Sequence, residues 1–176
     1  TSKRTTKKLA TPLGAGDAPS GSGFVTQDVS GAIVAIDLDL TLAPVPKERA
    51  RVVENPKTGQ VFGYTPARTS QFSREVGRVV EHVLTGRPPL SEPVRVDMTF
   101  SMPIPKSWPK WKKAAARDLL IMPTGRPDMD NLEKALLDAL NGGAIVDDAY
   151  VVESNARKIY EDIPAIKVRL ESMSSV

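Results

Sequence analysis

The sequence contains no cysteine and only one histidine, His82. The absence of cysteine excludes disulfide bonds and thiolate metal sites, and it fits a reducing compartment. A single histidine argues against a zinc site built from imidazoles and against a serine–histidine triad. His82 follows Glu81 within a helical pattern, and we interpret it as a surface or boundary residue.

Long apolar runs are also missing. No stretch approaches about 18 uninterrupted apolar residues, so the sequence predicts no transmembrane helix, and no secretory signal is visible. With 176 residues, 40% of them hydrophobic and 26% charged, the chain is long enough for one globular domain with a real core. We therefore expect a cytoplasmic protein that has no membrane partner.

The small excess of positive charge is concentrated near the N-terminus. The formal net charge is +3. Residues 1–23 hold more lysine and arginine than acid, whereas the rest of the chain is electrically balanced. Any nucleic-acid surface on the folded part must therefore come from local clusters of basic residues.

The chain divides into a tail and one domain. Residues 1–30 are rich in Ser, Thr, Gly, Lys and Pro and predict a disordered basic tail, and residues 31–176 predict the domain. Periodicity and turn residues predict strands over 32–40 and 94–102, a hairpin with its turn near 55–59, a helix that begins at Thr65-Pro66 and ends at Gly86, a short helix over 108–120, a helix over 128–140, and strands over 151–160 and 165–171. The expected fold class is α/β (α+β), with a mixed β-sheet of about four to five strands packed by about three helices.

The most informative segment surrounds the start of the helix over 128–140. Asp128 and Asp130 lie where a loop turns into this amphipathic helix, and Lys134 lies one turn beyond Asp130 on the same face. The pair Asp147-Asp148 follows the end of the helix and a short apolar run, which we interpret as a buried strand. Clustered carboxylates repel one another, and a hard divalent cation removes that cost. The pattern predicts a metal-dependent enzyme that acts on phosphodiesters.

These residues also have structural interpretations. Asp128 could be the N-cap of the helix. Asp130 could be an acid of the first turn that is stabilised by the positive end of the helix dipole, or it could form a surface ion pair with Lys134. None of these explains the later acid pair. An EF-hand loop starting at Asp128 fails because the chain has Glu133 where Gly is needed and Ala139 where an acid is needed.

A second acidic motif offers a rival function. The apolar run before Asp37 and Asp39 ends in Asp-x-Asp-x-Thr, which resembles the nucleophile motif of haloacid-dehalogenase-type phosphatases. In that alternative Asp37 is the nucleophile, Asp39 is the acid/base, and Mg²⁺ is still required. Leu40 stands where that family usually has glycine, and the motif leaves Asp128 and Asp130 unexplained. We interpret Asp37 and Asp39 as acids on the solvent face of an edge strand.

Three segments of the chain together resemble the signature of RusA-type Holliday junction resolvases. They are Pro127–Lys134, Leu137–Gly142 and Val146–Val152. Weaker similarity continues upstream in Pro44–Arg51, Tyr64–Pro66 and Met102–Trp108, so the resemblance covers roughly residues 31–171. It implies a Mg²⁺-dependent endonuclease, of a kind common in phages and prophages, that resolves four-way DNA junctions by paired symmetric nicks in DNA recombination and repair.

The resemblance also implies roles for individual residues. Asp128, Asp130 and Asp148 match metal-binding aspartates, Asp147 is a less certain additional ligand, and Lys134 matches the catalytic lysine. Mn²⁺ is expected to substitute for Mg²⁺, no small-molecule cofactor is expected, and the cut should leave a 5′-phosphate. A homodimer is implied as well, which suits symmetric cutting of two opposing strands.

DNA affinity is expected to come from clustered basic residues. The expected DNA-binding residues are Lys47, Arg49, Arg51, Lys106, Lys110, Lys112, Lys113, Arg117 and Arg126. Trp108 and Trp111 lie within the second cluster, where they either stack on unpaired bases near a branch point or pack under the helix. A non-catalytic protein that binds branched DNA is the remaining alternative, and a metal-dependent cleavage assay distinguishes it from a nuclease.

Overall fold

The architecture comes from a computed structural model. It describes residues 7–10, 19–48, 51–54, 56, 58–64 and 66–173. The main sheet has the strand order β1-β2-β3-β8-β6-β7. Its strands are β1 (Lys7–Ala10), β2 (Gly21–Gln27), β3 (Ile33–Leu40), β6 (Val94–Pro103), β7 (Val151–Glu161) and β8 (Ala165–Ser172). β6 and β7 pair in parallel and the other neighbours pair antiparallel, so the sheet is mixed, as predicted.

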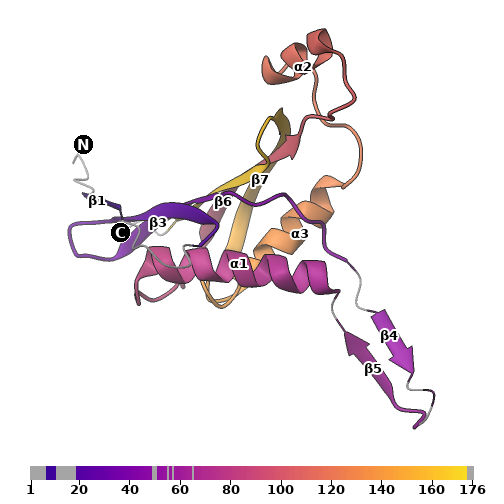
Figure 1. The fold of residues 1–176 in the computed structure, drawn as a ribbon. Helices are drawn as coiled ribbons and strands as arrows, with labels where there is room; N and C mark the ends of the chain where they lie inside the picture. The colour runs from indigo at the N-terminus through magenta and orange to yellow at the C-terminus, as the bar shows by residue number, and fades with distance from the viewer. Residues whose placement is uncertain are drawn as a thin grey trace.

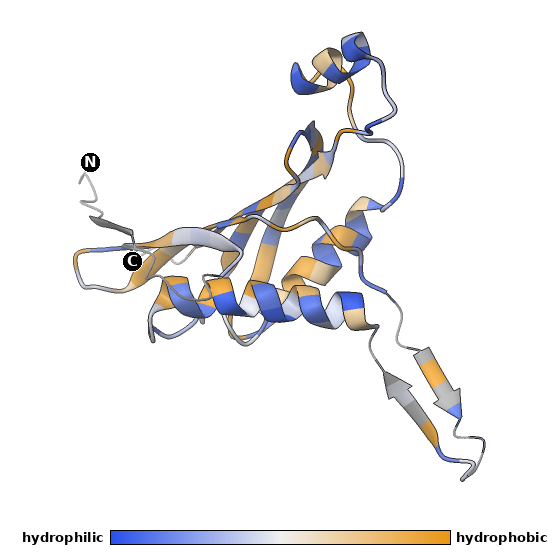
Figure 2. Cartoon of the chain, viewed as in Figure 1, coloured by the Kyte–Doolittle hydropathy of each residue, from blue (hydrophilic) through white to orange (hydrophobic). Residues whose placement is uncertain are grey.

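Two amphipathic helices cover one face of the sheet, as Figure 1 shows. They are α1 (Ala67–Leu84) and α3 (Met129–Leu140). α1 contacts β2, β3 and α3, and α3 also contacts β7. Hydrophobic and hydrophilic residues recur in turn along α1 in Figure 2, as expected of a helix with one apolar and one polar face. The apolar stripes of both helices join alternate apolar residues of the strands in one core, and burial on this face holds the two layers together.

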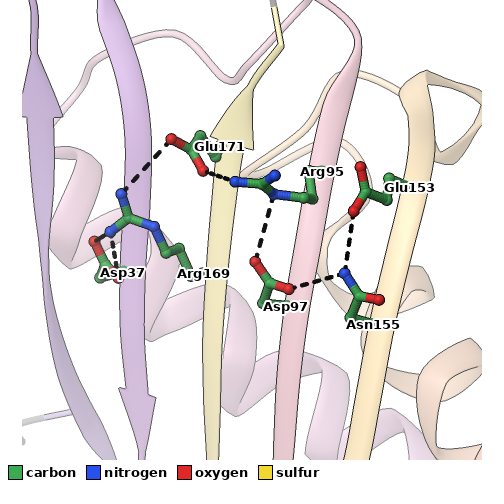
Figure 3. Close-up of polar contacts among 7 residues, drawn as sticks. All are labelled: Asp37, Arg95, Asp97, Glu153, Asn155, Arg169 and Glu171. Atoms are coloured by element: carbon green, nitrogen blue, oxygen red, sulfur yellow. Dashed lines mark hydrogen bonds and ion pairs between the residues drawn. The ribbon is translucent and has the colours of Figure 1, made fainter.

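The opposite face of the sheet carries charged side chains that pair across strands (Figure 3). Arg169 of β8 donates to both carboxylate oxygens of Asp37, at 3.0 and 2.7 Å. Arg95 of β6 donates to Glu171 at 2.6 Å. Because successive side chains of a strand point to opposite faces, the same strands that supply the core also supply this polar network.

Two further elements extend away from the sheet (Figure 1). The hairpin of β4 (Arg51–Glu54) and β5 (Val61–Tyr64) pairs antiparallel, as predicted. The short helix α2 (Lys110–Arg117) contacts β7 and is shorter than the predicted span of 108–120. Among the described residues, no helix is long and apolar enough to cross a membrane.

The expectation of a disordered tail over residues 1–30 is wrong for its described parts. Residues 21–27 form β2, which pairs with β1 on one side and β3 on the other. The composition did not predict this strand because it contains two glycines, Gly21 and Gly23, at positions where a side chain cannot fit. A Cβ atom at Gly21 would lie 2.6 Å from the carbonyl oxygen of Asp39, and a Cβ atom at Gly23 would overlap the carbonyl oxygen of Asp37. With β2 in place, β3 is an interior strand, so the expectation that it is an edge strand is also wrong.

Candidate active site

α3 carries the motif residues at its start. Asp128 occupies the N-cap position with an extended backbone, φ −71° and ψ 151°. The residues that α3 buries are Leu132, Ala135, Leu136 and Leu140. Burial of that stripe leaves Asp130 and Lys134 on the exposed face of the helix.

Asp128 takes the N-cap position and Asp130 lies in the first turn of α3, as the structural interpretations require, but the interactions of their side chains differ from those interpretations. The side chain of Asp128 accepts no capping hydrogen bond. Asp130 and Lys134 form no ion pair with each other, and neither has another hydrogen-bond or ion-pair partner among the described residues. Carboxylates that stabilise a fold are usually paired or hydrogen-bonded. The exposed motif side chains are therefore available to a ligand.

The backbone around these side chains is held by contacts from distant parts of the chain. Lys158 of β7 donates to the carbonyl oxygens of Gly125 and Pro127, at 3.0 and 2.9 Å. The backbone N–H of Lys47 donates to the carbonyl oxygen of Asn131 at 2.9 Å. The loop before Asp128 and the first turn of α3 are thus anchored to β7 and to the segment that precedes β4.

The second acid pair follows a tight turn after α3. The carbonyl oxygen of Leu140 accepts hydrogen bonds from the backbone N–H groups of residues 143–145. Within residues 144–146 only Ile145 forms isolated bridges, with Leu90 and Asn141, and there is no regular strand, so the expected buried strand is absent from this described segment. Asp147 caps a short 3₁₀ helix (Asp148–Tyr150) by accepting from the N–H of Ala149 at 2.8 Å. Asp148 is exposed and has no such partner among the described residues.

The predicted carboxylate cage is not assembled in this conformation. Within the described part of the chain, no group of three or more acidic or histidine side chains is gathered closely enough to hold a metal ion. Asp128 and Asp130 share the start of α3, whereas Asp147 and Asp148 follow its far end. The donor chemistry, oxygen atoms of unpaired carboxylates, nevertheless suits Mg²⁺, which is often held by one or two carboxylates together with waters and substrate phosphates.

A groove of about 610 Å³ lies beside Asp128. Its polar lining comes from Lys47, Arg68, Arg126, Asp128 and Asn131. The groove thus brings together two of the predicted DNA-binding residues, Lys47 and Arg126, with one of the predicted metal ligands. Its charge is predominantly positive, which suits an anionic ligand.

The other predicted DNA-binding residues that the structure describes do not line this groove. Lys106 and Lys110 are exposed on and before α2, and Lys113 donates to the carbonyl oxygen of Lys106 at 2.9 Å. Arg117 is held by Asp162 at 2.8 and 2.7 Å. Arg49 lies outside the described residues, as does the side chain of Arg51.

The two tryptophans near α2 have different surroundings. Trp108 packs edge-on against Tyr160, with ring centroids 5.1 Å apart, and the ammonium nitrogen of Lys112 lies 4.0 Å from the centre of its ring. Trp111 is 70% exposed. Packing therefore accounts for Trp108, and Trp111 remains free to stack on a base.

The rival phosphatase site lies elsewhere, on the open face of the sheet. A hollow of about 920 Å³ there is lined by Asp37 and Asp39 but by none of the residues around the start of α3. Asp37 is engaged through both oxygens by Arg169 (Figure 3). A carboxylate held in this way is a poor nucleophile, and its role in the cross-strand network explains its presence.

Comparison with known proteins decides between a nuclease of the RusA type and a phosphatase. The family model described as "Endodeoxyribonuclease RusA" matches residues 41–171. The chain belongs to the RusA endodeoxyribonuclease family. It is also 33% identical over 126 residues to a Bacillus subtilis (strain 168) protein named "Uncharacterized protein YqaN", an alignment that covers 68% of this chain and 84% of that protein.

The RusA match spans the predicted metal-binding and catalytic residues around α3, together with two residues that sequence reasoning missed, and it begins after Asp37 and Asp39 of the rival motif. Lys158 anchors the loop before Asp128, and Arg68 lines the groove beside it. Neither had a local signal, because each reaches the site only through the pairing of strands or the packing of helices.

Proposed function

We propose that this RusA-family chain is a Mg²⁺-dependent endodeoxyribonuclease that resolves four-way DNA junctions by paired symmetric nicks, as a homodimer acting in recombination and repair. The family match supports nuclease chemistry. The observation that carries the assignment to a site is the state of Asp128, Asp130, Lys134 and Asp148, whose side chains are exposed and have no partner in the described structure.

The proposed metal ligands are Asp128, Asp130 and Asp148, with Asp147 as an additional candidate. A bound Mg²⁺ ion supplies Lewis-acid stabilisation of the phosphate and an activated water. Since the described chain gathers no three of these acids, an ion held by one or two of them would take its remaining ligands from the oxygens of DNA and water. Mn²⁺ is expected to substitute for Mg²⁺.

The basic residues have three proposed roles. Lys134, on the same face of α3 as Asp130, stabilises negative charge that develops on the phosphate or on the leaving oxygen. Lys158 positions the loop that carries Asp128 through its bonds to Gly125 and Pro127. DNA affinity is assigned to the exposed lysines at α2 and to the basic groove.

A cleavage assay tests this proposal directly. A labelled four-way junction is incubated with the full chain in Mg²⁺, in Mn²⁺ and in EDTA, beside a linear duplex and a chromogenic phosphomonoester. We expect symmetric nicks with 5′-phosphate ends in either metal, and no cleavage in EDTA. Hydrolysis of the phosphomonoester without cutting of the junction would instead identify a phosphatase.

One observation favours a second candidate, a non-catalytic protein that binds branched DNA. The described residues do not present a preassembled three-carboxylate metal site. Such a protein would bind the junction in EDTA and in Mg²⁺ and would cut it in neither. The same assay therefore separates the two candidates.

A further inference from the structure

The basic groove beside Asp128 contains a residue to which no role has been assigned. Arg68, in the first turn of α1, lines it together with Arg126 from the loop before α3. The two arginines are 58 positions apart in the sequence and meet only because α1 and α3 pack together. We propose that this groove binds a phosphodiester of the strand that is cut, with Arg68 as one of its phosphate ligands.

The first argument is the state of the two guanidinium groups. Both side chains belong to exposed residues, and neither has a hydrogen-bond or ion-pair partner among the described residues. Lys47, which also lines the groove, is by contrast already paired with Asp138. Two unpaired guanidinium groups that line one groove are available to a phosphate, which accepts bidentate hydrogen bonds from arginine.

The second argument is a comparison of the two hollows. The larger one, on the open face of the sheet, has three acidic and three basic lining residues, so its charges balance. The groove has three basic residues against the single acid Asp128, and its positive excess remains when Lys47 is set against its partner Asp138, because two arginines then face one acid. A polyanion is therefore attracted to the groove and not to the larger hollow.

The third argument is the shape and composition of the groove. Its apolar lining consists of Ala43, Pro44, Pro46, Met102, Pro103 and Pro127. Proline has no N–H group and a fixed ring, so it makes a stiff surface suited to the apolar side of a sugar. A volume of about 610 Å³ lies within the roughly 300–1,000 Å³ typical of small-ligand sites, which is large enough for one nucleotide unit.

The groove lies directly beside the proposed metal site. Because Asp128 lines it, a phosphate bound there lies next to the proposed metal site. The inference rests on the proposed nuclease function and adds a contact to the strand beside the scissile bond. Arg68 accordingly binds and orients the substrate directly.

The test compares Arg68→Ala and Arg126→Ala with a matched control, Arg74→Ala. Arg74 is exposed on the same helix, six positions beyond Arg68, and lines neither hollow. Binding of the full chain to a four-way junction is measured in EDTA at several salt concentrations, and thermal unfolding confirms that each variant is folded. We expect each groove variant to bind roughly tenfold more weakly, with a salt slope lower by about one, and Arg74→Ala to match the wild type.

The outcomes separate this inference from the proposed function. If the wild type cuts the junction while Arg68→Ala and Arg126→Ala keep its affinity and salt slope, the groove assignment is wrong and the nuclease assignment stands. Equal weakening by Arg74→Ala would also overturn it, because the effect would then be one of overall charge. If the groove variants weaken binding but the wild type cuts nothing in Mg²⁺, the phosphate site stands and the nuclease proposal fails. Absence of junction binding by the wild type would overturn both.

Discussion

At the scale of single residues, two kinds of acid contrast among the described residues. Asp37, Glu171 and Asp162 are held by arginines and belong to the fold. Asp128 and Asp130 are exposed and unpaired in the described structure, although they begin a helix where a capping bond was available. The helix dipole alone accounts for an acid in the first turn but not for a second exposed acid without a capping bond, which is why we assign them to substrate chemistry.

Lys158 offers a prediction about positioning. Lys158→Met removes both bonds to the loop before Asp128. The variant should lower the single-turnover rate of junction cleavage by about tenfold, because small displacements of reacting groups are costly. Its junction affinity should change little, since the ammonium group is already occupied by carbonyl oxygens. Lys167→Met, on the open face of the sheet, is the matched control, and equal rates for the two variants would contradict the role given to Lys158.

At the scale of elements, α2 behaves as a basic arm attached by a few side chains. Trp108 packs on Tyr160, and Arg117 binds Asp162 beside the turn between β7 and β8. Lys110 has no partner among the described residues and Trp111 is largely exposed. The helix is therefore attached to the sheet at fixed points and presents unpaired cationic and aromatic side chains, as expected of a surface that binds single-stranded or branched DNA.

Replacement of Lys110, Lys112 and Lys113 together by alanine tests this arm. Each phosphate contact that is lost should reduce the salt slope of junction binding by about 0.9. We expect a lower slope and weaker binding, measured by titration in EDTA, with cleavage restored toward the wild-type rate at saturating protein. An unchanged salt slope would exclude this surface from DNA binding.

The attachment of α2 should depend on pH. The hydrogen bond from Arg117 holds the pKa of Asp162 below its ordinary value of 3.8. A lowered carboxyl pKa stabilises the folded state above the unfolded pKa, and this contribution is lost as the pH falls through the folded value. Tryptophan fluorescence should therefore report loosening of the arm below about pH 3.8. Asp162→Asn should show that loosened state already at neutral pH, and a wild-type signal from this variant would argue against the tether.

At the scale of the whole molecule, one apolar layer between the sheet and two helices carries the stability. Leu136 of α3 is fully buried in that layer. Leu136→Ala should lower the free energy of unfolding by about 2–5 kcal/mol, because it removes buried methyl groups and leaves a cavity. Denaturant unfolding measures this change, and Leu120→Ala, at a residue that is 78% exposed, is the control. A loss below about 1 kcal/mol for Leu136→Ala would contradict the central place of α3 in the core.

Local patterns in the sequence predicted the elements that build this layer. Apolar residues that recur with a period of two predict β3 and β6, and apolar residues that recur with a period of 3.6 predict α1 and α3. β2 did not, because Gly21 and Gly23 give no apolar signal and serve instead to bring two backbones close together. The order of strands, which makes β3 an interior strand, depends on long-range pairing that no local pattern contains.

The same distinction applies to the site. Asp128, Asp130 and Lys134 lie within one short motif, so spacing alone singled them out. Arg68 and Lys158 come from elements distant in the sequence, and only the packing of α1 and the path of β7 bring them to the loop before α3. The distance between the two acid pairs was also beyond sequence reasoning, because it depends on the turn after Leu140.

The most direct test of the central claim is single-turnover cleavage of a four-way junction in Mg²⁺ by Asp130→Asn and Asp148→Asn. Asp39→Asn is the matched control, since Asp39 is an exposed acid of the rival motif. The account predicts that each of the first two variants binds the junction about as well as the wild type. Each should cut it more slowly, by a factor larger than the roughly 10–100-fold loss of activity that removal of an outer-shell partner of a metal ligand causes. Asp39→Asn should cut at the wild-type rate. Undiminished cleavage by Asp130→Asn or Asp148→Asn, or its loss in Asp39→Asn, would contradict the assignment of the active site to the ends of α3.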